Sequence, residues 1–255
     1  MSLAVRGLAV QFGGVSALAD VSFAVEPGTI TSLIGPNGAG KTTAFNAITG
    51  YLRPTRGSVL YDGVPLDGLR PSQISRRGVV RTFQKTSVFP TLSVEENVMI
   101  GLHPRGRAGF WSILAARRSV RAEEMRLAAQ AAEILTFVGL AHRQRAEASA
   151  LPYGEQRLVE LAVALAAQPR MLLLDEPAAG MTGGEKELVS GLIRKIRDGG
   201  VTVFLVEHDM RMVMGISDTV IVLNHGRVIA EGDPAAIRAH PDVIRAYLGA
   251  AATRG

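Results

Sequence analysis

The stretch that decides the fold is Gly35-Pro36-Asn37-Gly38-Ala39-Gly40-Lys41-Thr42, with Thr43 directly after it. It fits the pattern G-x-x-x-x-G-K-[ST]. Residues 29–34 before it are β-branched and apolar, as in a buried strand, and residues 43–49 after it are expected to form a helix closed by Gly50. In this setting, backbone N–H groups and the positive end of the helix dipole hold a polyphosphate. We therefore predict nucleotide binding, with Lys41 at the β- and γ-phosphates and the Thr42 hydroxyl on Mg²⁺.

Length and composition limit the class of protein. The chain has 255 residues, of which 47% are hydrophobic and 20% charged, enough for one large domain or a domain with an insertion. No apolar run approaches the roughly 18 residues that a membrane span needs, and the first residues lack the layout of a signal peptide. The absence of cysteine excludes disulfides and thiolate sites. We expect a soluble, cytoplasmic protein.

The net charge of +5 raises the question of an anionic partner, either nucleic acid or a membrane surface. Arginines gather between Arg105 and Arg126. Such a run is most often the solvated face of a helix, so we do not favour nucleic acid as a partner.

Strand-like and helix-like patterns alternate along the chain. Strands are expected over 3–11, 21–25, 29–34 and 58–61, with turn signals between them. Residues 94–138 are helical in pattern, with core positions at Ile113, Leu114, Leu127, Ile134, Leu135 and Val138. Buried strands at 171–174 and 201–206 then flank a helix that opens with the capping-box pair Thr182 and Glu185. This order predicts a parallel α/β sheet with an inserted helical block.

A pair of acids, Asp175 and Glu176, follows the apolar strand at 171–174. Functional groups of open α/β sheets gather at the carboxyl ends of strands, so both acids are expected beside the phosphate loop. Asp175 suits a Mg²⁺ site, and Glu176 suits the group that orients or deprotonates an attacking water. The alternative is an acid pair that only begins a helix.

A histidine stands at the equivalent place on the next strand, in the sequence Glu207-His208-Asp209. A lone histidine is more often structural, but at a strand's carboxyl end it can donate a hydrogen bond to a γ-phosphate. The other four histidines have no such setting. Met210, Met212 and Met214 do not share one helix face, so we expect them to pack rather than to bind metal.

Taken in order, these motifs resemble the ATP-binding subunit of an ABC transporter over essentially the whole chain. The loop 35–43 matches Walker A, and 171–176 matches Walker B with its glutamate. The resemblance implies a Q-loop role for Gln84, as a Mg²⁺ ligand that senses the membrane subunit, and a switch role for His208. It also implies that Phe12 stacks on adenine with Val15 as a further ring contact.

The family's signature segment, L-S-G-G-Q, is represented by Leu151-Pro152-Tyr153-Gly154-Glu155. In the family this segment begins a helix and contacts the γ-phosphate held by the opposite subunit. Gly154 is kept, whereas Pro152 removes a hydroxyl and a backbone N–H, and Glu155 is acidic where the family has glutamine. A hydrogen bond to a charged group contributes about 1.5–3 kcal/mol, so we expect a working but slower site in trans.

The resemblance implies a P-loop NTPase of the ABC type, in the α/β class, with an antiparallel β subdomain and an inserted α-helical subdomain. The expected division is an ATP-binding core at 1–93 and 160–233, a helical subdomain at 94–159 and a C-terminal helical tail at 234–255. The segments 178–181, 206–218 and 241–249 are similar to the subgroup that serves branched-chain amino acid uptake.

What the resemblance implies for function is an ATPase, using ATP and Mg²⁺, on the cytoplasmic face of the plasma membrane. Its implied partners are a second ATP-binding subunit (a paralogue or an identical copy), two transmembrane permease subunits and, indirectly, an extracytoplasmic solute-binding protein. One rival is a soluble ABC ATPase acting on ribosomes or nucleic acid, although the chain has one Walker A motif and no sustained heptads. Another is a nucleotide sensor without turnover. The transported solute and the direction of transport rest on the resemblance alone.

Overall fold

The computed structural model describes residues 2–82, 88–102 and 117–252, and for 117–122 and 248–252 it describes the backbone. Contacts divide the chain into two compact units, one formed by Met1–Arg81 with Arg170–Gly255 and the other by Thr82–Pro169. The second unit therefore begins earlier and ends later than the helical subdomain expected at 94–159. The three-part division made from the sequence stays a prediction about functional regions.

The first unit contains a six-stranded sheet with the order β10-β9-β3-β8-β7-β6. Its strands are β10 (Arg227–Gly232), β9 (Thr219–Asn224), β3 (Ile30–Ile34), β8 (Thr202–Val206), β7 (Met171–Asp175) and β6 (Val79–Arg81). All pairs are parallel except β9 with β10. Every residue of β3, β7 and β8 is buried, which explains their continuous apolar sequences.

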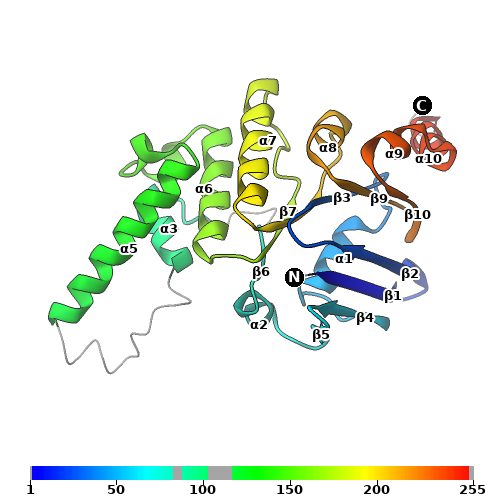
Figure 1. Cartoon of the computed structure of the whole chain (residues 1–255), viewed down its shortest axis with the longest axis horizontal. Helices are drawn as coiled ribbons and strands as arrows, with labels where there is room; N and C mark the ends of the chain where they lie inside the picture. The colour runs from blue at the N-terminus through cyan, green and yellow to red at the C-terminus, as the bar shows by residue number, and fades with distance from the viewer. Residues whose placement is uncertain (1, 83–87, 103–116, 253–255) are drawn as a thin grey trace. The chain divides into compact units, whose positions relative to one another are not determined.

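A four-stranded antiparallel sheet, in the order β2-β1-β4-β5, belongs to the same unit. It is made of β1 (Leu3–Phe12), β2 (Val15–Val25), β4 (Arg56–Tyr61) and β5 (Val64–Pro65). Aromatic side chains link it to the larger sheet: the Phe204 ring of β8 lies 5.5 Å from that of Phe23 and 4.9 Å from that of Phe45. Phe45 belongs to α1 (Lys41–Ile48), so one core joins this helix to both sheets (Figure 1).

The remaining helices of the first unit are α2 (Pro71–Arg76), α7 (Gly183–Asp198), α8 (Met210–Ile216), α9 (Pro234–Ala239) and α10 (Pro241–Ala252). The capping box predicted for α7 is present, because Glu185 accepts hydrogen bonds from the Thr182 N–H at 2.8 Å and from its hydroxyl at 2.7 Å. Met212 is buried in α8, while Met210 and Met214 pack against the neighbouring core, as predicted. Leu188, by contrast, is 69% exposed although its helix is amphipathic.

The second unit is helical. It contains α3 (Val94–Leu102), α5 (Arg117–Phe137), α6 (Tyr153–Ala166) and short 3₁₀ turns at Ala141–Arg143 and Ala148–Ala150. Helix α3 lies close to α6, since a Cβ on Gly101 would come within 2.6 Å of the Val163 carbonyl oxygen. The predicted core residues Leu127, Leu135 and Val138 are buried and Ile134 is half-buried; Ile113 and Leu114 lie outside the described residues. In the part of the chain that the structure describes, no helix has the length and apolar character to span a bilayer.

Several boundaries differ from those expected from the sequence. The second strand starts at Val15 rather than at residue 21, because Phe12 and Val15 already pair across the β1–β2 turn. The helix after the glycine-rich turn runs over Lys41–Ile48 rather than 43–49, because its N-terminal cap is Gly40. Strands β9 and β10 complete one edge of the larger sheet, where no strands were predicted.

Candidate nucleotide-binding site

The phosphate loop joins the end of β3 to the start of α1, and its backbone is fixed by close contacts. Gly35 has φ +152°, and a Cβ there would lie 2.0 Å from the carbonyl oxygen of Leu223 in β9. Gly40 has φ +105°, and a Cβ there would lie 2.6 Å from the Ala17 carbonyl oxygen. Side chains are therefore excluded at both ends of the loop, which explains the two glycines that define the motif.

Within the loop, Asn37, Gly38 and Thr42 are exposed, Pro36 and Thr43 are half-buried, and Ala39 is buried. The backbone of the loop has positive φ at three glycines: Gly35, the exposed Gly38 and Gly40. Such a turn followed by a helix N-terminus directs backbone N–H groups toward a bound anion. The geometry fits the predicted phosphate site, although the role of each loop residue stays a prediction.

The Lys41 side chain folds back over its own loop. Its Nζ donates hydrogen bonds to the carbonyl oxygens of Gly35 at 2.7 Å and Pro36 at 3.0 Å. Burial lowers the pKa of Lys41, and the nearby carboxylates of Glu176 and Asp175 oppose that shift. Phosphate oxygens would be stronger partners for this ammonium than the two neutral carbonyls, because hydrogen bonds between two ions are the strong ones.

Register places the two predicted acids at the same edge as the loop. Asp175 pairs with Val206 of β8, and Val206 pairs with Leu33 of β3, so the residues after all three strands emerge side by side. Asp175 is buried at 3% exposure. Glu176 has φ +49°, an unusual left-handed conformation for a glutamate, and its N–H donates to the Val206 carbonyl oxygen at 2.9 Å. Backbone strain of this kind concentrates at functional sites.

His208 reaches the same edge from the end of β8. Its Nδ1 lies 3.9 Å from Oε1 of Glu176, and its side chain is 60% exposed. The backbone around it is held firmly, because Asp209 caps α8 by accepting from the Met212 N–H at 3.1 Å and pairs with Lys186 at 2.6 Å. The Lys186 ammonium lowers the pKa of Asp209. An anchored backbone and an accessible imidazole suit a group that must contact a ligand.

Two buried charged residues near this edge were not predicted from the sequence. Arg81, the last residue of β6, donates from Nη2 to Asp175 Oδ2 at 2.6 Å, and the two side chains are 7% and 0% exposed. The signal in the sequence is a lone charge after Val79-Val80 and shortly before Gln84. This charge in the sequence does not predict that Arg81 pairs with Asp175, because the two residues come together only in the folded chain.

Glu207 is the other residue that sequence analysis missed. It is 1% exposed and accepts three backbone hydrogen bonds: from Ala178 at 3.0 Å, His208 at 3.0 Å and Asp209 at 3.3 Å. Its carboxylate thus joins the loop after Glu176 to the loop that carries His208. An acid directly after an apolar strand was visible in the sequence, but the position had no predicted role.

The predicted adenine contacts lie at the tip of the β1–β2 hairpin. Phe12 and Val15 pair across the turn and are 53% and 69% exposed. Exposed apolar side chains are unremarkable singly, but an exposed aromatic ring beside an aliphatic side chain offers a stacking surface for a planar ligand. Their contact with adenine stays a prediction.

The predicted signature segment belongs to the second unit, at the start of α6. Leu151 is buried, Pro152 occupies the N-cap position and makes no side-chain cap, Tyr153 is 48% exposed, and Gly154 is buried in the first turn. Glu155 is paired: its Oε2 lies 2.9 Å from Nε of Arg143 and its Oε1 lies 3.4 Å from Nη2. The Arg143 guanidinium therefore compensates the charge of the acid that replaces the family's glutamine. Gln84, the remaining predicted site residue, lies outside the described residues.

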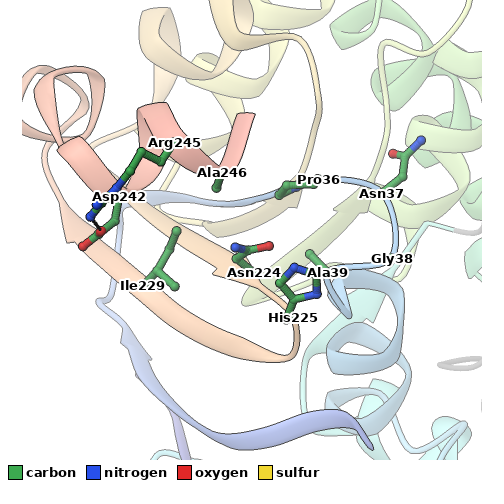
Figure 2. A pocket seen from close by; sticks show the side chains of 10 residues that line it. All are labelled: Pro36, Asn37, Gly38, Ala39, Asn224, His225, Ile229, Asp242, Arg245 and Ala246. Carbon is green, nitrogen blue, oxygen red and sulfur yellow. Dashed lines mark hydrogen bonds and ion pairs between the residues drawn. The ribbon is translucent and has the colours of Figure 1, made fainter. Parts of the chain in front are cut away.

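A cavity of about 660 Å³ borders the phosphate loop. Figure 2 shows its lining, which comes from the loop (Pro36, Asn37, Gly38, Ala39), the β9–β10 turn (Asn224, His225), β10 (Ile229) and α10 (Asp242, Arg245, Ala246). Asp242 and Arg245 form an ion pair on the far rim from the loop. This cavity adjoins the loop on the side of α10, whereas the acids Asp175, Glu176 and Glu207 lie at the ends of β7 and β8.

Comparison with known proteins identifies the family. The family model described as ABC transporter matches residues 18–179, and a second, described as branched-chain amino acid ATP-binding cassette transporter, matches residues 227–253. The chain is 45% identical over 250 residues to the high-affinity branched-chain amino acid transport ATP-binding protein LivG of Escherichia coli strain K12, covering 98% of each protein. It is 43% identical over 250 residues to BraF of Pseudomonas aeruginosa, again covering 98% of each.

Solved structures agree with the sequence comparison. An ATP-binding cassette of an ABC transporter in its ADP conformation has a TM-score of 0.85 and 32% identity, with coverage of 98% of this chain and 99% of that one. A nucleotide-free cassette has a TM-score of 0.84 and 31% identity, with coverage of 97% and 99%. These findings confirm the fold class and the resemblance inferred from the motifs. The chain belongs to the ATP-binding proteins of the ABC transporter family.

Proposed function

We propose that this chain is the ATP-hydrolysing subunit of an importer for branched-chain or other hydrophobic amino acids. One observation carries the proposal: Lys41, Asp175, Glu176 and His208 meet at one sheet edge in a chain that is 45% identical to LivG over 98% of its length. The match of residues 227–253 to the branched-chain amino acid model supports the same subgroup. The names of these relatives favour a transporter over a soluble ATPase acting on ribosomes or nucleic acid.

ATP binds with its phosphates in the loop 35–43. The Lys41 ammonium exchanges the Gly35 and Pro36 carbonyls for the β- and γ-phosphate oxygens, and the N-terminus of α1 adds its dipole. Phe12 stacks on the adenine ring, with Val15 beside it. Affinity for the nucleotide thus comes from a pre-formed phosphate site and a small exposed stacking surface.

The donor set fits Mg²⁺, which takes oxygen ligands and is usually held by one or two protein groups together with phosphate oxygens and water. Thr42 offers a hydroxyl and Asp175 a carboxylate, and Gln84 is the third proposed ligand. Among the described residues, no group of three or more His, Cys, Asp or Glu side chains could hold a metal ion by itself. When bound, the ion neutralises charge on the β- and γ-phosphates.

For hydrolysis, Glu176 orients or deprotonates the attacking water, and His208 donates a hydrogen bond to the γ-phosphate. Residues 151–155 of a second ATP-binding subunit, an identical copy or a paralogue, contact that γ-phosphate in trans. Closure of the pair follows ATP binding because these contacts exist only in the closed state. An isolated subunit therefore hydrolyses ATP poorly.

The assembly that this function needs includes two transmembrane permease subunits and, indirectly, an extracytoplasmic solute-binding protein. The chain then sits on the cytoplasmic face of the plasma membrane and contacts the permeases through Gln84 and the helical unit. These partners give the transporter its solute specificity.

Purification of the tagged chain from gently solubilised native membranes tests the proposal, with partners identified by mass spectrometry. We expect two polytopic membrane proteins and a second small ATPase. A strain lacking the chain should also lose high-affinity uptake of radiolabelled leucine. Recovery with ribosomes or nucleic acid, and unchanged leucine uptake, would contradict the importer.

A further inference from the structure

Arg81 links the carboxylate that ends β7 to the helix that begins at the phosphate loop. Besides its 2.6 Å ion pair with Asp175, its Nη1 donates to Oδ1 of Asn46 at 2.7 Å and to the Thr49 hydroxyl oxygen at 3.2 Å. Asn46 lies in α1, and Thr49 is the residue that caps its C-terminus. The guanidinium also lies over the Phe45 ring, 5.5 Å from its centroid. One side chain therefore fixes the distance between α1 and Asp175.

The environment makes this link rigid. The Arg81 and Asp175 side chains are 7% and 0% exposed, so water does not compete for their ion pair. Thr49 is further held because its hydroxyl donates to the Phe45 carbonyl oxygen at 2.6 Å, which leaves its lone pairs for Arg81. A planar guanidinium with donors in fixed directions suits this task, whereas a lysine offers a single point charge.

The link matters because Thr42, on α1, and Asp175 are the two proposed Mg²⁺ ligands that the structure describes. The Thr42 hydroxyl is in the first turn of α1, and Asp175 ends β7. A metal with strict octahedral geometry tolerates little change in the spacing of its ligands. Residues that orient metal ligands without touching the metal often control its affinity.

We propose that Arg81 is a positioning residue for magnesium-bound nucleotide: it holds the Asp175 carboxylate and α1 at the spacing that the ion requires. The inference rests on the proposed function, since it assumes that Mg²⁺ and nucleotide bind here. Arg81 itself contacts neither the ion nor the nucleotide in this proposal. It acts through Asp175 on one side and through Asn46 and Thr49 on the other.

The test measures binding of a fluorescent ADP analogue to the full chain, with excess Mg²⁺ and with EDTA. The ratio of the two dissociation constants is the magnesium-dependent gain in affinity. Arg81→Met should reduce this gain about 10-fold or more while leaving the affinity in EDTA unchanged. Arg81→Lys should recover part of the gain. Arg76→Met, at an exposed arginine of α2, is the matched control and should leave the gain intact.

A double-mutant cycle shows whether Arg81 acts through Asp175. Asp175→Asn should reduce the gain by itself, and adding Arg81→Met to it should reduce the gain no further. If Arg81→Met does not fold, Asn46→Ala removes one of its α1 contacts and should reduce the gain less strongly. An equal loss of affinity in Mg²⁺ and in EDTA, or an undiminished gain, would overturn the inference. Failure of the unmodified chain to bind the analogue would instead contradict the proposed function.

Discussion

The two segments proposed to contact ATP, the phosphate-loop edge of the first unit and the start of α6 in the second, are built differently. At the first, Lys41, Asp175 and Glu207 are at most 9% exposed and each is held by hydrogen bonds or ion pairs. At the second, Tyr153 is 48% exposed, and Glu155 is paired with two partly exposed side chains, Arg143 at 2.9 Å and His142 at 3.9 Å. The first segment is therefore fixed by the core of its unit, whereas the second depends on local surface contacts.

This difference suggests how each segment responds to substitution. Removing one partner from a buried, hydrogen-bonded charge leaves the other unsatisfied and costs far more than losing an exposed pair. Substitutions at the phosphate-loop edge should therefore affect stability, nucleotide affinity or chemistry strongly, each according to what the residue contacts. Substitutions at the start of α6 should have small effects that appear only when two subunits associate.

Glu176→Gln should have the largest effect. The amide keeps the shape of the side chain at this strained position but cannot accept a proton, and general base catalysis contributes about 100- to 10,000-fold to rate. We expect the rate of ATP hydrolysis by the assembled transporter to fall by that factor, with nucleotide affinity retained. Phosphate release and ADP binding, measured on the same preparation, separate the two. Hydrolysis at an unchanged rate would remove Glu176 from the proposed mechanism.

Glu207→Ala should destabilise the first unit without a direct effect on nucleotide contacts. Three backbone N–H groups lose their acceptor, and a buried donor left unsatisfied costs about 1–3 kcal/mol. Water entering the space offsets part of this, so we expect the free energy of unfolding to fall by roughly 3 kcal/mol. Urea denaturation followed by circular dichroism measures the change.

Glu207→Gln is the matched control for that substitution. Its single carbonyl oxygen can still accept from Ala178 or from the His208 and Asp209 N–H groups, but its amide group then faces donors on the other side. The loss of stability should lie between those of the unmodified chain and the alanine variant. An alanine variant as stable as the unmodified chain would show that these hydrogen bonds contribute nothing net.

Lys41→Met should reduce nucleotide affinity and leave stability unchanged, which is the opposite of what we expect for Glu207→Ala. The ammonium is desolvated in the nucleotide-free protein, which lowers its pKa, so its removal should not reduce the free energy of unfolding. The variant loses hydrogen bonds to charged phosphates, worth about 1.5–3 kcal/mol, so ADP affinity should fall roughly 10- to 150-fold. Isothermal titration calorimetry measures the affinity. A variant that unfolds easily but binds ADP normally would show that Lys41 stabilises the fold and does not bind phosphate.

The pH dependence of ADP binding checks Lys41 without a substitution. Phosphate favours the charged ammonium, so binding raises its pKa, whereas burial in the free protein keeps the pKa below the usual 10.5. Affinity should therefore be full below the free-state pKa and should fall as pH rises through it. In Lys41→Met this decline should be absent. An identical decline in both proteins would assign it to another group.

Sequence analysis predicted the phosphate-loop edge well because its information is local. A glycine needed at positive φ, a lysine at a helix start and acids after apolar strands are all visible within a few residues of one another. The start of β2 at Val15 and the pair β9 and β10 were missed, although β9 has the same continuous apolar sequence as β7 and β8. Its place beside β3 is a contact between distant segments that only the fold reveals.

The supporting charges could not be predicted for the same reason. Arg81 and Asp175 are 94 residues apart in the chain, and Ala178 and Glu207 are 29 apart, so each pair exists only once the sheet has formed. The ion pair of Glu155 could not be predicted from the sequence either. Its replacement of the family's glutamine was visible, but its pairing with Arg143 was not.

Arg143→Ala should give the smallest effect, and it tests whether the start of α6 is held by surface contacts alone. Arg143 and Glu155 side chains are 41% and 24% exposed, and such pairs contribute about 0.2–1 kcal/mol. Without the arginine, the Glu155 carboxylate keeps only the more distant His142, 3.9 Å away, among its described basic neighbours, so more of its negative charge acts on the phosphates proposed to bind across the interface. The ATP concentration for half-maximal pairing of Glu176→Gln subunits should therefore rise, by roughly 1.4- to 5-fold. ADP affinity of the single chain should not change, because this segment contacts no nucleotide in cis.

Adding Glu155→Gln to Arg143→Ala should restore pairing, since the repulsive charge is then gone, although it also removes an acid that favours the α6 N-terminus. If the double variant pairs no better than Arg143→Ala, the arginine acts by packing and the compensation of charge is not its role.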